Sequence, residues 1–143
     1  MRRATSILFL LSLAFGYALG LIFAIGLSAR IDWPWQPLAG RSGLAVHLLY
    51  GLPHALAVIS VAAVVGLALL LRYRHAAPKL ALVVALPAAL NLLLSIVQLA
   101  EMQMPSLQNA MLMLKDLLLI TVAPMAITVL MMRITGQWMT LRV

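Results

Sequence analysis

The sequence predicts an all-α membrane protein in which four transmembrane helices form an antiparallel bundle. Of its 143 residues, 65% are hydrophobic and 9% are charged, so there is too little polar surface to cover a soluble domain of this size. Its apolar residues form runs of about 20 or more without strict polar alternation, the length that a helix needs to cross a bilayer. We expect spans at residues 6–29, 44–71, 80–100 and 109–132 within a single domain, 1–143.

The distribution of basic residues predicts the orientation, because Lys and Arg near short loops stay on the cytoplasmic side. With both termini cytoplasmic, seven basic residues lie inside and two, Arg30 and Arg41, lie outside. We therefore expect a multi-pass protein of a bacterial-type inner (plasma) membrane. The net charge of +7 suits anionic lipid headgroups at helix ends, and no nucleic-acid partner is expected because no groove-reading element accompanies it. The seven inner residues are Arg2, Arg3, Arg72, Arg74, Lys79, Arg133 and Arg142.

The first span begins behind two arginines and is read as a retained signal anchor, because its apolar run is longer than that of a usual signal peptide. It also carries a stripe of small residues at every fourth position, which predicts close helix packing. The partner of this stripe is another helix of the same chain, a second copy or a different subunit. The stripe consists of Ser12, Gly16, Gly20, Ala24 and Ser28.

Tryptophans mark both predicted interfaces. Trp33 and Trp35 lie in the first outer loop beside two prolines, and Trp138 lies near the C-terminus. Indole rings favour the headgroup region, so we expect all three to be interface anchors. Alternatively, Trp33 and Trp35 form a surface on which a partner protein docks.

The second span contains His47 and His54, seven residues apart and therefore on nearly the same helical face. Pro53 removes a backbone hydrogen bond between them and predicts a bend. Three interpretations stay open: histidines hydrogen-bonded within the bundle, a metal or haem site, and a proton-titrating role. No cofactor or metal is predicted, because one copy cannot supply facing histidines from two helices.

Further polar residues lie in the third and fourth spans, towards the same outer end as His47 and His54. Asn91 and Gln98 share one face that continues towards Glu101, which predicts a polar seam between helices. Lys115 and Asp116 interrupt the fourth span, and ionisable residues at membrane depth are functional candidates. Adjacent helical residues point about 100° apart, so we expect Lys115 to pair with Glu101 and Asp116 to accept from His47, His54 or Arg41. A structural ion-pair cluster, a substrate or proton site and an intersubunit contact are the alternatives.

These features favour a small non-catalytic integral membrane subunit or accessory protein of a larger membrane assembly. Short loops and the lack of a nucleophile or ligand motif argue against an enzyme. The expected partners are the lipid bilayer and either other membrane subunits or further copies of the chain. The alternative is a small oligomeric transporter or channel whose outer-facing site is formed by the polar cluster His47, His54, Asn91, Gln98, Glu101, Lys115 and Asp116.

Overall fold

The computed structural model describes the backbone of residues 2–31, 44–102 and 107–140, and the side chains of 5–31, 51–98, 111 and 113–136. The described backbone is helical almost throughout. Its four α-helices are α1 (Arg2–Ser28), α2 (Leu44–Tyr73), α3 (Ala77–Met102) and α4 (Leu107–Thr140), and a short 3-10 turn, η2 (Arg74–Ala76), joins α2 to α3.

The all-helical prediction is confirmed for the described residues, and the predicted apolar segments fall within these helices to within a residue at their ends. Three stretches are long and apolar enough to cross a membrane: Thr5–Ser28, Gly51–Gln98 and Met113–Gly136. The second stretch has 48 residues and runs through α2, η2 and α3, so it contains the point at which the chain reverses direction. Membrane-spanning helical character is therefore a property of this chain.

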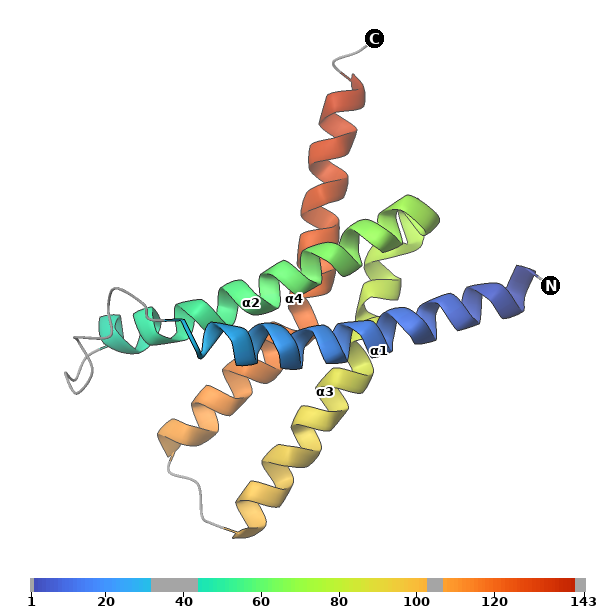
Figure 1. The fold of residues 1–143 in the computed structure, drawn as a ribbon. Helices are drawn as coiled ribbons and strands as arrows, with labels where there is room; N and C mark the ends of the chain where they lie inside the picture. The colour runs from blue at the N-terminus through green and yellow to red at the C-terminus, as the bar shows by residue number, and fades with distance from the viewer. Residues whose placement is uncertain (1, 32–43, 103–106, 141–143) are drawn as a thin grey trace.

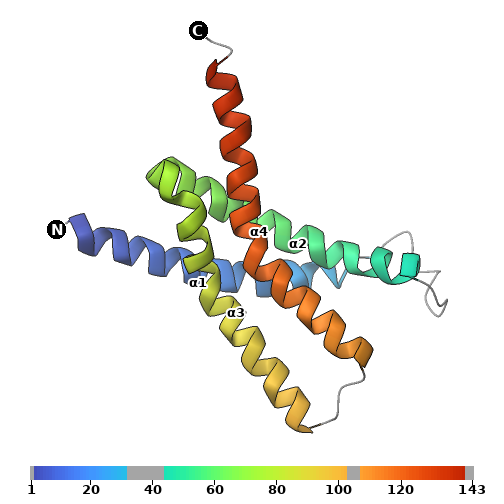
Figure 2. The same ribbon diagram turned by 180° about the vertical axis from the view of Figure 1, so that it is seen from behind.

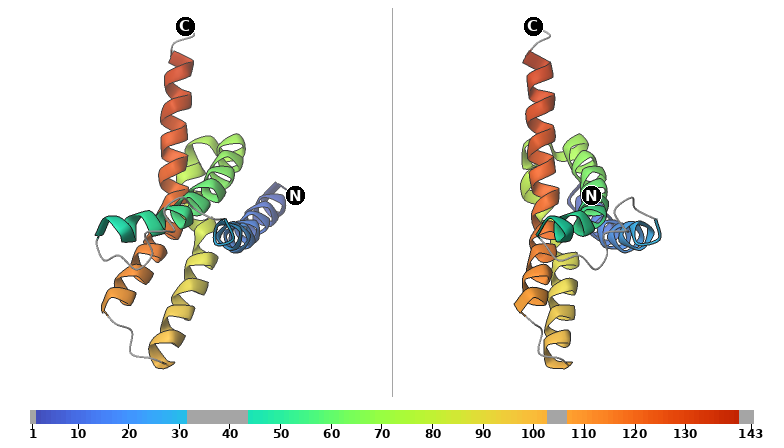
Figure 3. Two further views of the ribbon diagram at one scale, coloured as in Figure 1. Left: turned by 60° about the vertical axis from the view of Figure 1, so that its left-hand side comes forward. Right: turned by 90° about the vertical axis from the view of Figure 1, so that its left-hand side faces the viewer.

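The helices are arranged as two antiparallel hairpins that cross each other (Figure 1). One hairpin is α1 with α2, and the other is α3 with α4; Figure 2 shows the same crossing from behind. The two hairpins cross, and their other ends splay apart (Figure 3), but the end of α2 stays joined to the start of α3 through η2, where Leu69 and Ala77 belong to one buried cluster. The start of α1, the α2–α3 junction and the end of α4 all lie on one side of the crossing.

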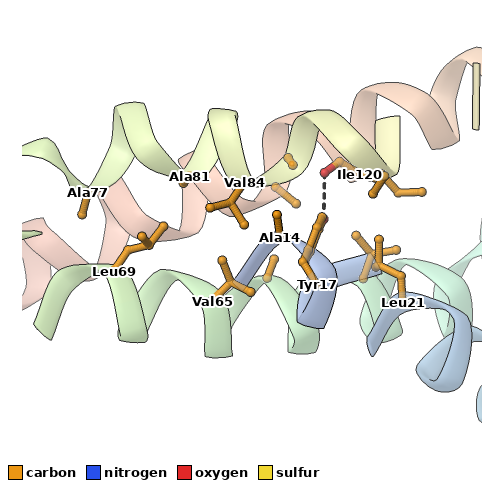
Figure 4. Close-up of a cluster of buried hydrophobic side chains, with 14 residues drawn as sticks. Ala14, Tyr17, Leu21, Val65, Leu69, Ala77, Ala81, Val84 and Ile120 are labelled. Carbon is orange, nitrogen blue, oxygen red and sulfur yellow. Dashed lines mark hydrogen bonds between the residues drawn. The ribbon is translucent and has the colours of Figure 1, made fainter. Parts of the chain in front are cut away.

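Small side chains at the crossing explain how the hairpins approach each other. Ala77, Ala81 and Ala85 recur every fourth residue along α3, and each is fully buried. Such a stripe lets helix backbones come close, which is the main source of packing energy where lipid competes with apolar contacts. Val65 and Leu69 of α2 belong to the same cluster (Figure 4).

A proline bends α4 where it passes through this core. Pro124 lies inside α4 and is fully buried, and the helix changes direction partway along its length. Proline has no N–H, so the carbonyl of Ile120, four residues earlier, loses its helical partner. The Tyr17 hydroxyl of α1 donates to this carbonyl at 2.7 Å in the buried core (Figure 4). The tyrosine thereby ties α1 to the proline bend of α4.

Candidate functional site

The ionisable side chains of the apolar helices meet between α2 and α4. His54 Nε2 of α2 lies 3.7 Å from Asp116 Oδ1 of α4, and Lys115 Nζ lies 3.3 Å from the same oxygen. About a third or less of the His54 and Asp116 side chains is exposed, at 28% and 30%. The structure thus brings three residues of the predicted polar cluster together.

Lys115 pairs with its neighbour in the sequence, and the expectation that these two residues would not pair is wrong. The long lysine stem folds back so that the ammonium group reaches the carboxylate. Gly51 of α2 provides the room, because a Cβ atom at that position would stand 3.3 Å from Lys115 Nζ. A glycine on the facing helix therefore allows a geometry that residue spacing alone disfavours.

The hydrogen-bonding capacity of this cluster is not fully used. His54 Nε2 and Asp116 Oδ1 are buried atoms without a hydrogen-bond partner in the described part of the chain. Their separation of 3.7 Å exceeds hydrogen-bond length, so the contact is electrostatic.

The cluster lies in the first third of α4. Lys115 and Asp116 follow the first residue of this helix, Leu107, by about two turns. The lysine side chain is 49% exposed, in keeping with an ammonium group near the edge of the hydrocarbon region.

Asn91 and Gln98 do not join this cluster. Both are exposed on α3, and neither side-chain amide hydrogen-bonds to another described residue. Ser95, by contrast, donates its hydroxyl to the Asn91 carbonyl at 3.0 Å within the same helix. The predicted seam on α3 is therefore a polar face directed away from the rest of the chain.

Five further predicted residues lie outside the described side chains: His47, Glu101, Trp33, Trp35 and Trp138. Neither the pairing of Lys115 with Glu101 nor the role of the tryptophan anchors is tested. Among the residues that the structure does describe, no three His, Cys, Asp or Glu side chains gather closely enough to hold a metal ion.

The small-residue stripe of α1 is only partly covered by the chain itself. A Cβ atom on Gly20 would lie 2.9 Å from Val61 Cγ1 of α2, whereas one on Gly16 would meet nothing within 4 Å. Ser12 is exposed, and Ala24 and Ser28 are half-buried. The stripe therefore contacts α2 at Gly20 and is exposed at Ser12 and Gly16.

Sequence reasoning missed the buried contact between Tyr17 and Ile120. A tyrosine inside an apolar helix needs an acceptor, and a proline inside a helix frees one four residues earlier. These two signals are visible in the sequence, yet only the fold shows that they meet.

Comparisons with family models, with curated proteins and with solved structures find no match to this chain. The class of protein is therefore defined by the fold itself, as an all-helical protein with membrane-spanning helices.

Proposed function

We propose that this chain is a small, non-catalytic subunit or accessory protein of a larger assembly in a bacterial-type inner membrane. In this proposal the four helices each cross the bilayer, and both termini are cytoplasmic. The orientation is supported by Arg72, Arg74 and Lys79, which surround the α2–α3 junction on the same side of the crossing as the two chain ends.

The observation that carries the proposal is the polar face of α3. Asn91 and Gln98 lie on one face with Leu94, which is 62% exposed. Pro87 begins this face and frees the Val83 carbonyl from its helical hydrogen bond. Amides and a free carbonyl have no hydrogen-bonding partner in lipid, so this face gains most from a polar helix of another subunit.

The test removes the amides without changing side-chain size. The protein carrying Asn91→Leu and Gln98→Met is extracted gently from its own membrane, and the chains that accompany it are identified by native mass spectrometry. Each amide contributes roughly 0.6–2 kcal/mol within a membrane, so the loss of both should lower partner retention about 10- to 1,000-fold.

Ser60→Ala is the matched control for this experiment. Ser60 is also exposed, but its hydroxyl already donates to the Leu56 carbonyl at 2.8 Å, so it needs no partner. Different co-purifying chains that are lost only from the Asn91→Leu/Gln98→Met variant would support the subunit proposal. A protein that purifies solely with itself, or alone, would refute it.

A second function, a small oligomeric transporter or channel, is favoured by the cluster of His54, Lys115 and Asp116. His54 Nε2 and Asp116 Oδ1 are buried and form no hydrogen bond with a described residue, which suits them to binding a proton or a polar substrate. Asp116→Asn keeps the shape of the side chain and removes its charge. For a transporter we expect this variant to abolish flux in vesicles while the oligomer stays intact, and an unchanged flux would exclude the site.

A further inference from the structure

A cavity of about 630 Å³ opens between the end of α2, η2 and the last part of α4. This volume is within the range of roughly 300–1,000 Å³ that is typical of small-molecule sites. It lies at the opposite end of α2 and α4 from the His54–Asp116 contact. Its lining residues are Leu67, Leu70, Leu71, Met131, Met132 and Ile134, with Arg74, His75, Thr135 and Gly136.

The cavity lining has an apolar part and a polar part, as a site for an amphiphilic molecule requires. Leucine, methionine and isoleucine side chains supply the apolar part, and Leu71 is 80% exposed, so this part is open to surrounding lipid. Arg74 and His75 supply hydrogen-bond donors from η2. The cavity also lies where the predicted span 109–132 is followed by Arg133, and basic residues at the end of a span mark the level at which lipid headgroups meet hydrocarbon.

Among the residues that the structure describes, no acidic side chain lies at this end of the molecule. The chain contains three acidic residues, and the one whose side chain is described, Asp116, lies at the other end of α4. Arg72 is placed over the Phe9 ring at 4.5 Å, whereas Arg74 forms no ion pair with any described residue. An anion from outside the chain is the natural partner for Arg74.

The backbone of Arg74 supports the same assignment. Its φ of 42° falls in the left-handed region, which glycine adopts freely and which costs other residues roughly 1–2 kcal/mol. An arginine stands at a helix end where glycine would be the least strained residue. The unfavourable backbone conformation is explained if the Arg74 guanidinium group makes a stabilising interaction that glycine could not make.

We propose that this cavity binds one phospholipid with an anionic headgroup. The phosphate contacts Arg74 and His75, and an acyl chain lies along Leu67, Leu71 and Met131. This inference depends on the membrane character of the chain but not on which of the two proposed functions it performs.

The test is a lipid titration of the full-length, delipidated protein in mild detergent, read out by native mass spectrometry. Dioleoyl phosphatidylglycerol is compared with dioleoyl phosphatidylcholine, which has the same acyl chains and no net charge. We expect the anionic lipid to bind at least about fivefold more tightly, which corresponds to one basic side chain at an anionic surface. Equal binding of the two lipids would overturn the proposal.

Three substitutions locate the site. Arg74→Gln should weaken binding of phosphatidylglycerol about fivefold, and Arg74→Lys should restore it. Arg133→Gln is the matched control, because Arg133 is exposed on the same part of α4 but does not line the cavity. We expect it to change binding by less than about twofold, and equal losses from Arg74→Gln and Arg133→Gln would mean diffuse attraction and would overturn the proposal.

The apolar part of the site has an independent test. Gly136 lines the cavity and a Cβ atom there would meet nothing within 4 Å, so Gly136→Leu adds apolar volume at the lining with room for its Cβ and raises helix propensity. This variant should fold and should lose phosphatidylglycerol binding. Retained binding in Gly136→Leu, or full competition by inorganic phosphate, would show that no acyl chain occupies the cavity and would refute the assignment.

Discussion

The hydrogen bond from Tyr17 to the Ile120 carbonyl should be worth more than an ordinary tyrosine contact, because Pro124 leaves that carbonyl without a helical donor. Tyr17→Phe removes the hydroxyl group and keeps the ring in the core. A hydrogen bond between membrane helices averages about 0.6 kcal/mol, and an orphaned buried carbonyl costs about 1–3 kcal/mol. We therefore expect Tyr17→Phe to lower the free energy of unfolding by about 1–2 kcal/mol.

The reasoning is tested by coupling this change to Pro124→Ala. Alanine at this position restores the backbone N–H, which can donate to the Ile120 carbonyl within α4. The tyrosine hydroxyl is then no longer needed, and Tyr17→Phe should cost less than about 0.5 kcal/mol in this background. The double-mutant cycle isolates the coupling from any other effect of straightening α4.

The assay is reversible unfolding in bicelles, measured for the four members of the cycle. Tyr73→Phe is the control: its hydroxyl lies 3.5 Å from the Ser6 carbonyl, so it should cost less than about 0.5 kcal/mol. A coupling energy of zero between Tyr17→Phe and Pro124→Ala would refute the assignment, even if each single variant were destabilised.

Two further predictions concern glycines at helix contacts, measured in the same unfolding assay. Gly20→Leu should destabilise the protein by about 1–3 kcal/mol, because its Cβ would stand 2.9 Å from Val61 Cγ1, whereas Gly16→Leu should be tolerated because its Cβ meets nothing within 4 Å. Equal costs would argue against the described packing of α1 on α2. Gly66→Ala should also destabilise the protein, because its Cβ would stand 2.8 Å from Thr128 Oγ1. Adding Thr128→Ala removes that oxygen and should recover most of the loss, and the absence of any recovery would contradict the α2–α4 contact.

The positions of the helices could be predicted from the sequence, and their crossing could not. Apolar length is a local property, so each predicted span lies within one helix to within a residue. The crossing depends on which small residues meet. The stripe of α1 is visible in the sequence because it contains glycines, whereas the fully buried Ala77, Ala81 and Ala85 of α3 are indistinguishable there from other apolar residues.

The sequence predicts which residues form the candidate site better than it predicts which of them contact each other. His54 was one of three expected partners for Asp116, and the two side chains do meet. The Lys115 ammonium group lies beside Gly51 of the facing helix while it contacts Asp116, and no spacing rule along α4 can reveal that neighbour. The exposure of Asn91 likewise follows from how the hairpins cross.

Pro53, Pro87 and Pro124 each lie inside a helix, and the sequence around them does not distinguish their roles. The surrounding fold decides what each proline does. Each removes one helical hydrogen bond. Pro124 is buried at the crossing, and the carbonyl that it frees is satisfied by Tyr17. Pro87 is exposed on α3, and no side chain of the described part of the chain donates to the Val83 carbonyl. A proline whose freed carbonyl is matched within the fold stabilises a bend, and one whose carbonyl is unmatched beside exposed Asn91 marks a face that another helix can complete.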